Sequence, residues 1–248
     1  MKKQILISGI FFLITPVSLL AQIEILFEYC ALQNSHTESF VGLDDGYAVV
    51  FEGIAGLHNP RVITFDNNNE EVWNYLIPFG DHPDRILSDG DALYITSDKG
   101  MELAGEPEND DICVTRLSLS GDFVWQTCFG GSLNDRPANA CMGSNTIIVV
   151  GSGYSEDDIF SNSFGSSEGI VASIGLNGNV LSSLSFGGTR NDIILWADPL
   201  AEDGTHNILG FTFSQDGGFE DIPSVGAIPT EPNVFFATVE ISGEPLGG

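Results

Sequence analysis

The stretch SGDFVWQTCFGGSLND, residues 120–135, returns as NGNVLSSLSFGGTRND at residues 177–192. Both copies join a turn signal to a short apolar run, a Phe-Gly-Gly segment and an Asn-Asp pair. A weaker copy has its turn at Asn67–Asn69 and continues with Phe79-Gly80 and then Asp84, and a fourth turn signal stands at Ser242-Gly243. A repeat of roughly 50 to 65 residues indicates stacked copies of one supersecondary unit.

Each copy contains short runs rich in Val, Ile, Phe and Thr, the residues that β-strands favour. Turns rich in Asn, Ser and Gly join the third run of a copy to the fourth, which predicts tight hairpins. We expect an all-β fold, a β-propeller-like array of about four four-stranded antiparallel blades. The first runs are Arg85–Leu87, Ala138–Met142 and Ile193–Ala197; the second are Gly46–Phe51, Ala92–Thr96, Thr146–Val150 and Asn207–Phe213; the third are Arg61–Phe65, Ile112–Leu117, Ile170–Leu176 and Val234–Ile241; the fourth are Val72–Ile77, Phe123–Phe129 and Val180–Phe186.

The two ends of the repeat array complement each other. The segment Ile23–Cys30 aligns with a fourth run, with Cys30 on Cys128, and no third run precedes it. The last copy has a third run but no usable fourth, because Glu244–Gly248 is short and contains a proline. We predict that Ile23–Cys30 pairs near Val234–Val239 and closes the ring. The rival hypothesis is a piece of a larger propeller, since the terminal Gly-Gly falls on the Gly-Gly of the repeat.

Residues 1–22 have the features of a signal peptide. Lys2-Lys3 is a basic start, Ile5–Leu13 is apolar, and Leu20-Ala21-Gln22 contains a small residue suited to cleavage. Residues 23–248 then form the repeat domain of a protein that we expect to be secreted, either extracellular or at the cell surface. No later segment of the sequence is apolar enough to span a bilayer.

Removal of the signal peptide leaves six basic residues against 35 acidic ones, a formal charge near −29. Such a chain repels polyanions, so nucleic acid is not an expected partner, whereas a protein or a glycan is compatible with this charge. The chain is nevertheless 42% hydrophobic and only 17% charged. This composition is typical of a folded domain and not of a disordered one.

The four cysteines permit disulfides in a secreted chain. If Ser120-Gly121 is a two-residue hairpin turn, Cys113 and Cys128 face each other across the hairpin. Opposed residues of an antiparallel pair have Cα atoms about 4.5–5.5 Å apart, which suits a disulfide. We therefore predict a Cys113–Cys128 bond. No comparable argument pairs Cys30 with Cys141.

The sequence resembles the secreted bacterial β-propeller proteins that carry SBBP-type repeats. Their phrase of a turn, Trp, Phe-Gly-Gly and Asp is matched by Gly121–Asp135, with Trp125 in place, and by Gly178–Asp192 without the tryptophan. In these proteins a further element follows the Asp, and Asp44-Asp45-Gly46 and Glu202-Asp203-Gly204 resemble it. The resemblance covers about residues 40–248. It implies a propeller architecture and no particular activity, because the family has no single established one.

Most reactive-looking residues have a structural interpretation. The segment Gly165–Gly169 matches G-x-S-x-G, but it precedes a β run and not the helix that a nucleophilic serine needs. The histidines and cysteines lack metal-ligand spacing, so we predict no metal or cofactor site. Asp84, Asp135 and Asp192 occupy the same place in three copies. We interpret them as acceptors of backbone N–H bonds in the turn after Phe-Gly-Gly.

The connections between second and third runs are long and acidic, and we expect them to gather on one face. Carboxylate-rich loops could hold Ca²⁺, but none has an EF-hand pattern or a nonapeptide calcium repeat, and solvated loops are the favoured interpretation. The carboxylates are Asp98, Glu102, Glu106, Glu108, Asp110 and Asp111 in one loop, Glu156, Asp157, Asp158 and Glu168 in the next, and Asp216, Glu220, Asp221 and Glu231 in the last.

The leading functional hypothesis is a secreted, non-catalytic binding or surface-interaction module, because the sequence contains no catalytic motif. The alternative is a propeller-fold glycan-active enzyme, a lyase or a hydrolase. Its candidate carboxylates, and the candidate binding residues of the module, are Glu156, Asp157 and Asp158. The sequence identifies neither the ligand nor the number of blades in the assembled ring.

Overall fold

The computed structural model describes residues 36–52, 60–77, 81–100, 110–157, 165–198, 205–219 and 232–240. These residues form antiparallel sheets. They contain no α-helix, and their helical element is the one-turn 3-10 helix η2 (Gly217–Phe219). The strands are β1 (His36–Leu43), β2 (Gly46–Glu52), β3 (Arg61–Asp66), β4 (Glu71–Leu76), β5 (Asp81–Ser88), β6 (Ala92–Gly100), β7 (Asp110–Ser118), β8 (Phe123–Phe129), β9 (Asp135–Met142), β10 (Thr146–Gly153), β11 (Glu168–Gly175), β12 (Val180–Phe186), β13 (Asp192–Ala197), β14 (Thr205–Thr212) and β15 (Asn233–Glu240).

The strands form four sheets, and within each sheet they pair in chain order. The first sheet is β1–β4, the second β5–β8, the third β9–β12 and the fourth β13–β15. The predicted all-β fold is therefore confirmed as four antiparallel sheets of three or four strands. Strand β1 was not predicted, because HTESFVGL has no continuous apolar run.

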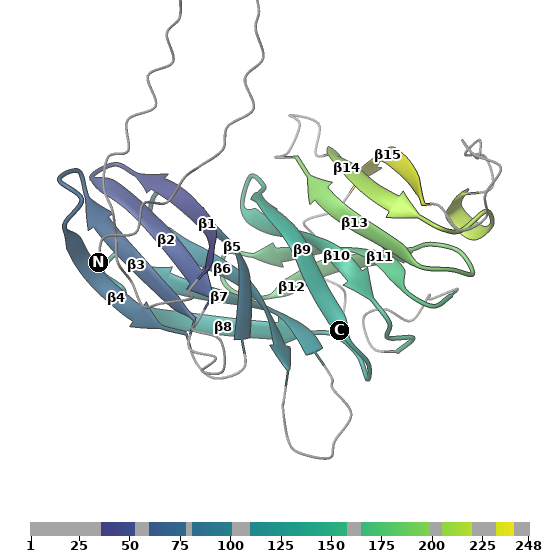
Figure 1. The fold of residues 1–248 in the computed structure, drawn as a ribbon, viewed down its shortest axis with the longest axis horizontal. Coiled ribbons are helices and arrows are strands. Elements are labelled where there is room, and N and C mark those ends of the chain that lie inside the picture. Colours follow the sequence, from purple (N-terminus) through teal and green to yellow (C-terminus); the bar gives the residue numbers. More distant parts are fainter. Residues whose placement is uncertain are drawn as a thin grey trace, which may run out of the picture.

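The four sheets stand side by side, with the first at one end of the row and the fourth at the other (Figure 1). The first strand of each sheet contacts the first strand of the next, so β1, β5, β9 and β13 form a continuous inner row. The described residues do not form a closed ring. The predicted closing segment, Ile23–Cys30, lies outside the described residues, and ring closure stays a prediction.

Three apolar cores lie between neighbouring sheets. The core between the first and second sheets contains Ala48, Val50, Val62, Ile86, Leu93 and Ile95. The next core joins residues such as Tyr94 and Val114 to Val149 and Ala172, and the last joins Val150 and Val171 to Ile208 and Phe235. Strands between two cores are buried on both faces, which explains why all eight residues of β11 are buried and why the second and third runs are continuously apolar.

The hairpins between third and fourth strands share one turn. In the second sheet, Gly121 N donates to Ser118 O at 3.0 Å and Ser118 N to Asp122 O at 2.8 Å, which closes a three-residue loop. Gly121 has a φ of 88°. One extra residue, Val124, then forms a bulge in β8. The predicted two-residue turn is wrong, because the loop has three residues that end in a left-handed glycine.

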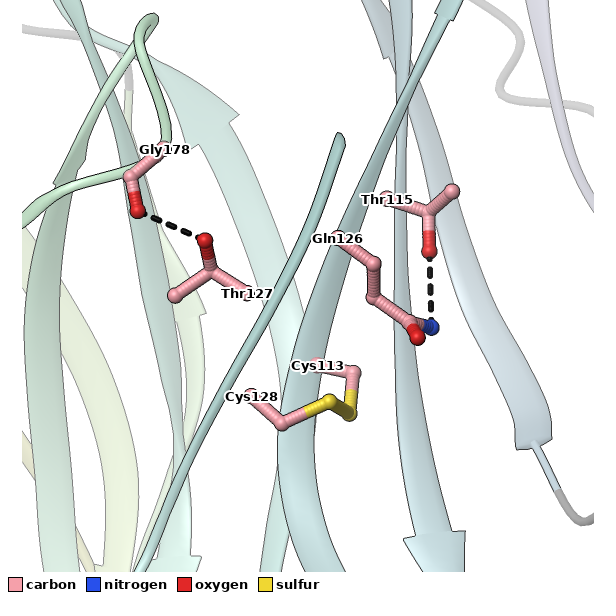
Figure 2. The surroundings of a disulfide bond; sticks show 6 residues. All are labelled: Cys113, Thr115, Gln126, Thr127, Cys128 and Gly178. Carbon is pink, nitrogen blue, oxygen red and sulfur yellow. Dashed lines mark hydrogen bonds between the residues drawn. A yellow bond between two sulfur atoms is a disulfide. The ribbon is translucent and has the colours of Figure 1, made fainter. Parts of the chain in front are cut away.

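The loop and the bulge compensate each other in register. The longer loop shifts the pairing by one residue, the bulge at Val124 shifts it back, and Cys113 again faces Cys128. The structure joins these cysteines in the predicted disulfide, with Cα atoms 4.0 Å apart. Figure 2 shows the disulfide on one side of β8, whereas Thr127 points to Gly178 in the next sheet. The Thr127 hydroxyl donates to the Gly178 carbonyl at 2.6 Å.

A tryptophan on the fourth strand joins each of the first two sheets to the turn of the following sheet. Trp73 Nε1 donates to the carbonyl of Leu119 at 2.8 Å, and Trp125 Nε1 donates to that of Leu176 at 3.3 Å. Both indole rings lie against the left-handed glycine of that turn, where a Cβ at Gly121 or Gly178 would come within 3.0 Å of ring atoms. The turn glycine therefore serves its own hairpin and the packing of the preceding sheet.

Gly178→Ala tests this double role, and Gly90→Ala is a matched control. Both glycines have a φ of 91°, but a Cβ at Gly90 would meet no atom within 4 Å. The left-handed backbone alone should cost Gly90→Ala about 1–2 kcal/mol of unfolding free energy. Gly178→Ala should lose more, because its methyl group also displaces the Trp125 ring. Urea denaturation measures both losses, and equal losses would exclude a role for the ring contact.

The disulfide predicts a stability that depends on oxidation. The bond closes a 15-residue separation, for which the chain-entropy model expects about 3 kcal/mol. The double variant Cys113→Ala/Cys128→Ala should unfold with a free energy lower by about that amount and should not respond to reductant. The wild-type protein should approach the same value when reduced. Recovery of both cysteines as free thiols by peptide mapping of oxidised protein would contradict the pairing.

Candidate functional site

Asp135 organises the turn that leads from the second sheet to the third. It is the first residue of β9 and is fully buried. Its Oδ2 accepts the N–H of Gly131 at 2.8 Å and the hydroxyl of Ser155 at 2.8 Å. Burial raises the pKa of the Asp135 carboxyl, and the hydrogen bonds from Ser155 and Gly131 oppose that rise. The carboxylate thus fastens the Phe-Gly-Gly turn to the loop after β10.

The same arrangement recurs between the third and fourth sheets. Asp192, the first residue of β13, is 1% exposed. Its Oδ2 accepts the N–H of Gly188 at 2.8 Å and the hydroxyl of Ser214 at 2.9 Å. The interpretation of Asp135 and Asp192 as acceptors of backbone N–H bonds is therefore confirmed by the hydrogen bonds themselves.

The assignment of Asp84 to this position is wrong. Strand pairing places Pro83 and Pro137 at one register position, each directly before the bulge of its first strand. The residue equivalent to Asp135 is then Asp81, the first residue of β5, whereas Asp84 is the bulge residue. The link into the second sheet is two residues shorter than the later links. Matching Phe79 to Phe129 in the sequence therefore displaced the alignment by two positions.

Of the three candidate carboxylates, Asp157 has a structural role. Its Oδ1 accepts the N–H of Ser132 at 2.8 Å, just as Oδ1 of Asp216 accepts the N–H of Thr189 at 2.8 Å in the next copy. Thr189 N–H, together with the Thr189 hydroxyl, holds the pKa of Asp216 below its usual range. The sequence signal for this element is Ser-x-Asp after the second run, and this signal was not among the predicted motifs.

The other two candidates do not join Asp157 in a site. Glu156 is exposed, and Asp158 lies outside the described residues, as do 101–109 and 220–231 of the acidic loops. The serine of the G-x-S-x-G match, Ser167, is buried, and its hydroxyl lies 3.5 Å from the carbonyl of Asp192 that it hydrogen-bonds. This serine supports the start of β13 and does not occupy an exposed nucleophile turn.

Among the described residues, one charged cluster occurs at a single junction between sheets. Arg136 of β9 reaches Asp110 of β7 and Asp98 of β6 at the end of the inner strands. Its Nε lies 2.7 Å from Asp110 Oδ2 and 3.6 Å from Asp98 Oδ2, and its Nη2 also contacts Asp110 Oδ2. The equivalents of Asp98 and Asp110 in the third sheet are Ser152 and Ser167. The cluster of Asp98, Asp110 and Arg136 is thus specific to the junction of the second and third sheets.

The cluster is partly buried and carries an excess of negative charge. The side chains of Asp98 and Asp110 are 15% and 9% exposed, whereas that of Arg136 is 54% exposed. Burial raises the pKa of Asp98; His82 and Arg136 oppose this rise, and the charge of Asp110 adds to it. Asp98 Oδ1 is buried without a hydrogen-bond partner. A half-exposed guanidinium held by two carboxylates can donate hydrogen bonds to a ligand at this junction.

No described arrangement resembles a metal centre. Among the described ranges, no group of three or more His, Cys, Asp or Glu side chains is placed to hold a metal ion. The structure also describes no helix that is long and apolar enough to cross a membrane. Comparison of the chain with protein-family models and with curated protein sequences found no match.

Asp192→Ala should destabilise the junction between the third and fourth sheets. The substitution removes the acceptor of the Gly188 N–H and the Ser214 hydroxyl, and buried donors left without an acceptor cost about 1–3 kcal/mol. Glu156→Ala is the control, because an exposed side chain away from such contacts changes stability by about 0.5 kcal/mol or less. Chemical denaturation of both variants measures the difference. Equal, small effects would contradict a structural role for Asp192.

Proposed function

We propose that the protein is a secreted, non-catalytic binding or surface-interaction module, similar in architecture to the secreted bacterial β-propeller repeat proteins. The observation that carries the proposal is the repeated use of its conspicuous carboxylates as turn acceptors. Asp135 and Asp157 have the same contacts as Asp192 and Asp216 one sheet later. A role shared by successive repeats supports a scaffold and leaves those groups unsuited to a single catalytic centre.

The proposed binding surface is the end of the sheets that carries the cluster of Asp98, Asp110 and Arg136. The residues at these positions differ between the second and third sheets, and a recognition site on a repeated scaffold needs such a difference. The charge of the chain, near −29 without residues 1–22, favours a cationic protein or a neutral glycan over a polyanion. The disulfide agrees with an oxidising, extracellular location.

The alternative, a propeller-fold glycan-active enzyme, needs an acid and a base that face one substrate. Asp157 accepts a backbone N–H bond, and Glu156 is exposed. Asp98 and Asp110 both contact Arg136. No described pair favours this alternative.

Binding without turnover is the expected result. Polylysine, a panel of neutral polysaccharides and duplex DNA serve as probes in biolayer interferometry with the full chain. We expect binding of polylysine or of one polysaccharide, weakened several-fold by Asp98→Asn/Asp110→Asn, and no binding of DNA, because the charge near −29 repels phosphate. The control is Glu156→Gln, which removes an exposed charge outside the cluster.

The same polysaccharides then test the enzyme directly. We expect no release of reducing ends or unsaturated products after prolonged incubation. Release of such products by the wild-type protein but not by Asp98→Asn/Asp110→Asn would contradict a non-catalytic module. Binding of DNA and of no other probe would also contradict the proposal.

A further inference from the structure

The fourth sheet is short of a strand. In the first three sheets the third strand has a neighbour on both edges, and its residues are largely buried, as in β11, which is buried throughout. The third strand of the fourth sheet, β15, has only Phe235 buried. Val234 and Phe236 are 60% and 65% exposed. In the described part of the chain, no strand pairs with the edge of β15 that faces away from β14.

Strand pairing identifies the position that a fourth strand would occupy. Cys113 of β7, Ile170 of β11 and Phe235 of β15 hold one register position, because each aligns through the second strand with the residue before the bulge of its first strand. In the complete sheets this position faces Leu76 of β4, Cys128 of β8 or Ser185 of β12. A fourth strand on β15 would place its residue at this register position opposite Phe235.

The segment Ile23–Cys30 has the pattern and the spacing of such a strand. It aligns with β8 so that Cys30 takes the place of Cys128. Cys30 precedes Thr37, the residue before the bulge of β1, by seven positions. Leu76, the equivalent residue of β4, precedes Pro83 by the same seven positions. Because β4 already completes the first sheet, a strand at Ile23–Cys30 would be a surplus fourth strand.

We propose that Ile23–Cys30 adds to β15 as the antiparallel fourth strand of the fourth sheet of the same chain. Cys30 then lies opposite Phe235, and Tyr29 lies opposite Phe236. The added strand satisfies the edge N–H and C=O groups of β15, which would otherwise invite aggregation. Tyr29 and Phe236 form a cross-strand aromatic pair of the kind that stabilises sheets. The pairing joins the two ends of the row in Figure 1.

A cysteine pair tests the register in the full chain. Tyr29→Cys/Phe236→Cys places two thiols opposite each other at a separation that a disulfide can span. The matched control, Glu28→Cys/Phe236→Cys, moves one thiol by one residue and so to the other face of the strand. Both variants carry Cys30→Ser to remove the neighbouring thiol. We expect non-reducing peptide mapping of the monomer to find the 29–236 link in several-fold higher yield than the 28–236 link.

Equal yields of the two links would overturn the proposal, and so would a 29–236 link that joins two chains. Hydrogen exchange decides the case if the cysteine variants do not fold. The outward amide protons of β15 should exchange about tenfold or more slowly in the wild-type chain than in a variant lacking residues 23–30, with β11 unchanged. Equal exchange of β15 in both proteins would overturn the proposal.

Discussion

A residue with positive φ at the end of a three-residue loop sets the register of each hairpin between the third and fourth strands. Asn69, Gly121 and Gly178 hold this place, with φ values of 63°, 88° and 91°. A non-glycine residue seldom adopts this conformation, and asparagine tolerates it best. The loop turns the chain, and the bulge that follows restores the pairing. The disulfide between Cys113 and Cys128 exists because these two shifts cancel.

The same turns also couple one sheet to the next. An indole ring from the preceding sheet lies on Gly121 and another on Gly178, and each indole donates a hydrogen bond to a carbonyl of the turn it covers. A Cβ on either glycine would press against that ring. The third copy has Ser182 where the first two have Trp73 and Trp125. The third sheet therefore lacks this contact toward its neighbour and relies on the apolar core around Phe235 and Phe219.

The sequence predicted the strand units because apolar runs and turn residues are local signals. It predicted the disulfide from a two-residue turn that the structure does not have, and the pairing is right because the bulge at Val124 cancels the extra loop residue. It missed β1, whose polar and small residues pair with β2 through the backbone. It also misplaced Asp84. The link from β4 to β5 is two residues shorter than the later links, and an alignment on Phe-Gly does not detect this difference. The Asp98–Arg136 contact depends on how two sheets stand side by side, so no spacing in the chain could indicate it.

Repetition separates structural carboxylates from candidates for recognition. Asp135 and Asp192 are acceptors for backbone N–H groups that every such turn must satisfy, so a change at either position would be selected against for stability alone. Asp98 and Asp110 satisfy no repeated backbone need, and their partner Arg136 is half exposed. Burial of these two carboxylates costs desolvation free energy, which their contacts with Arg136 offset. The part of the structure that the repeat does not explain is therefore where a ligand is best sought.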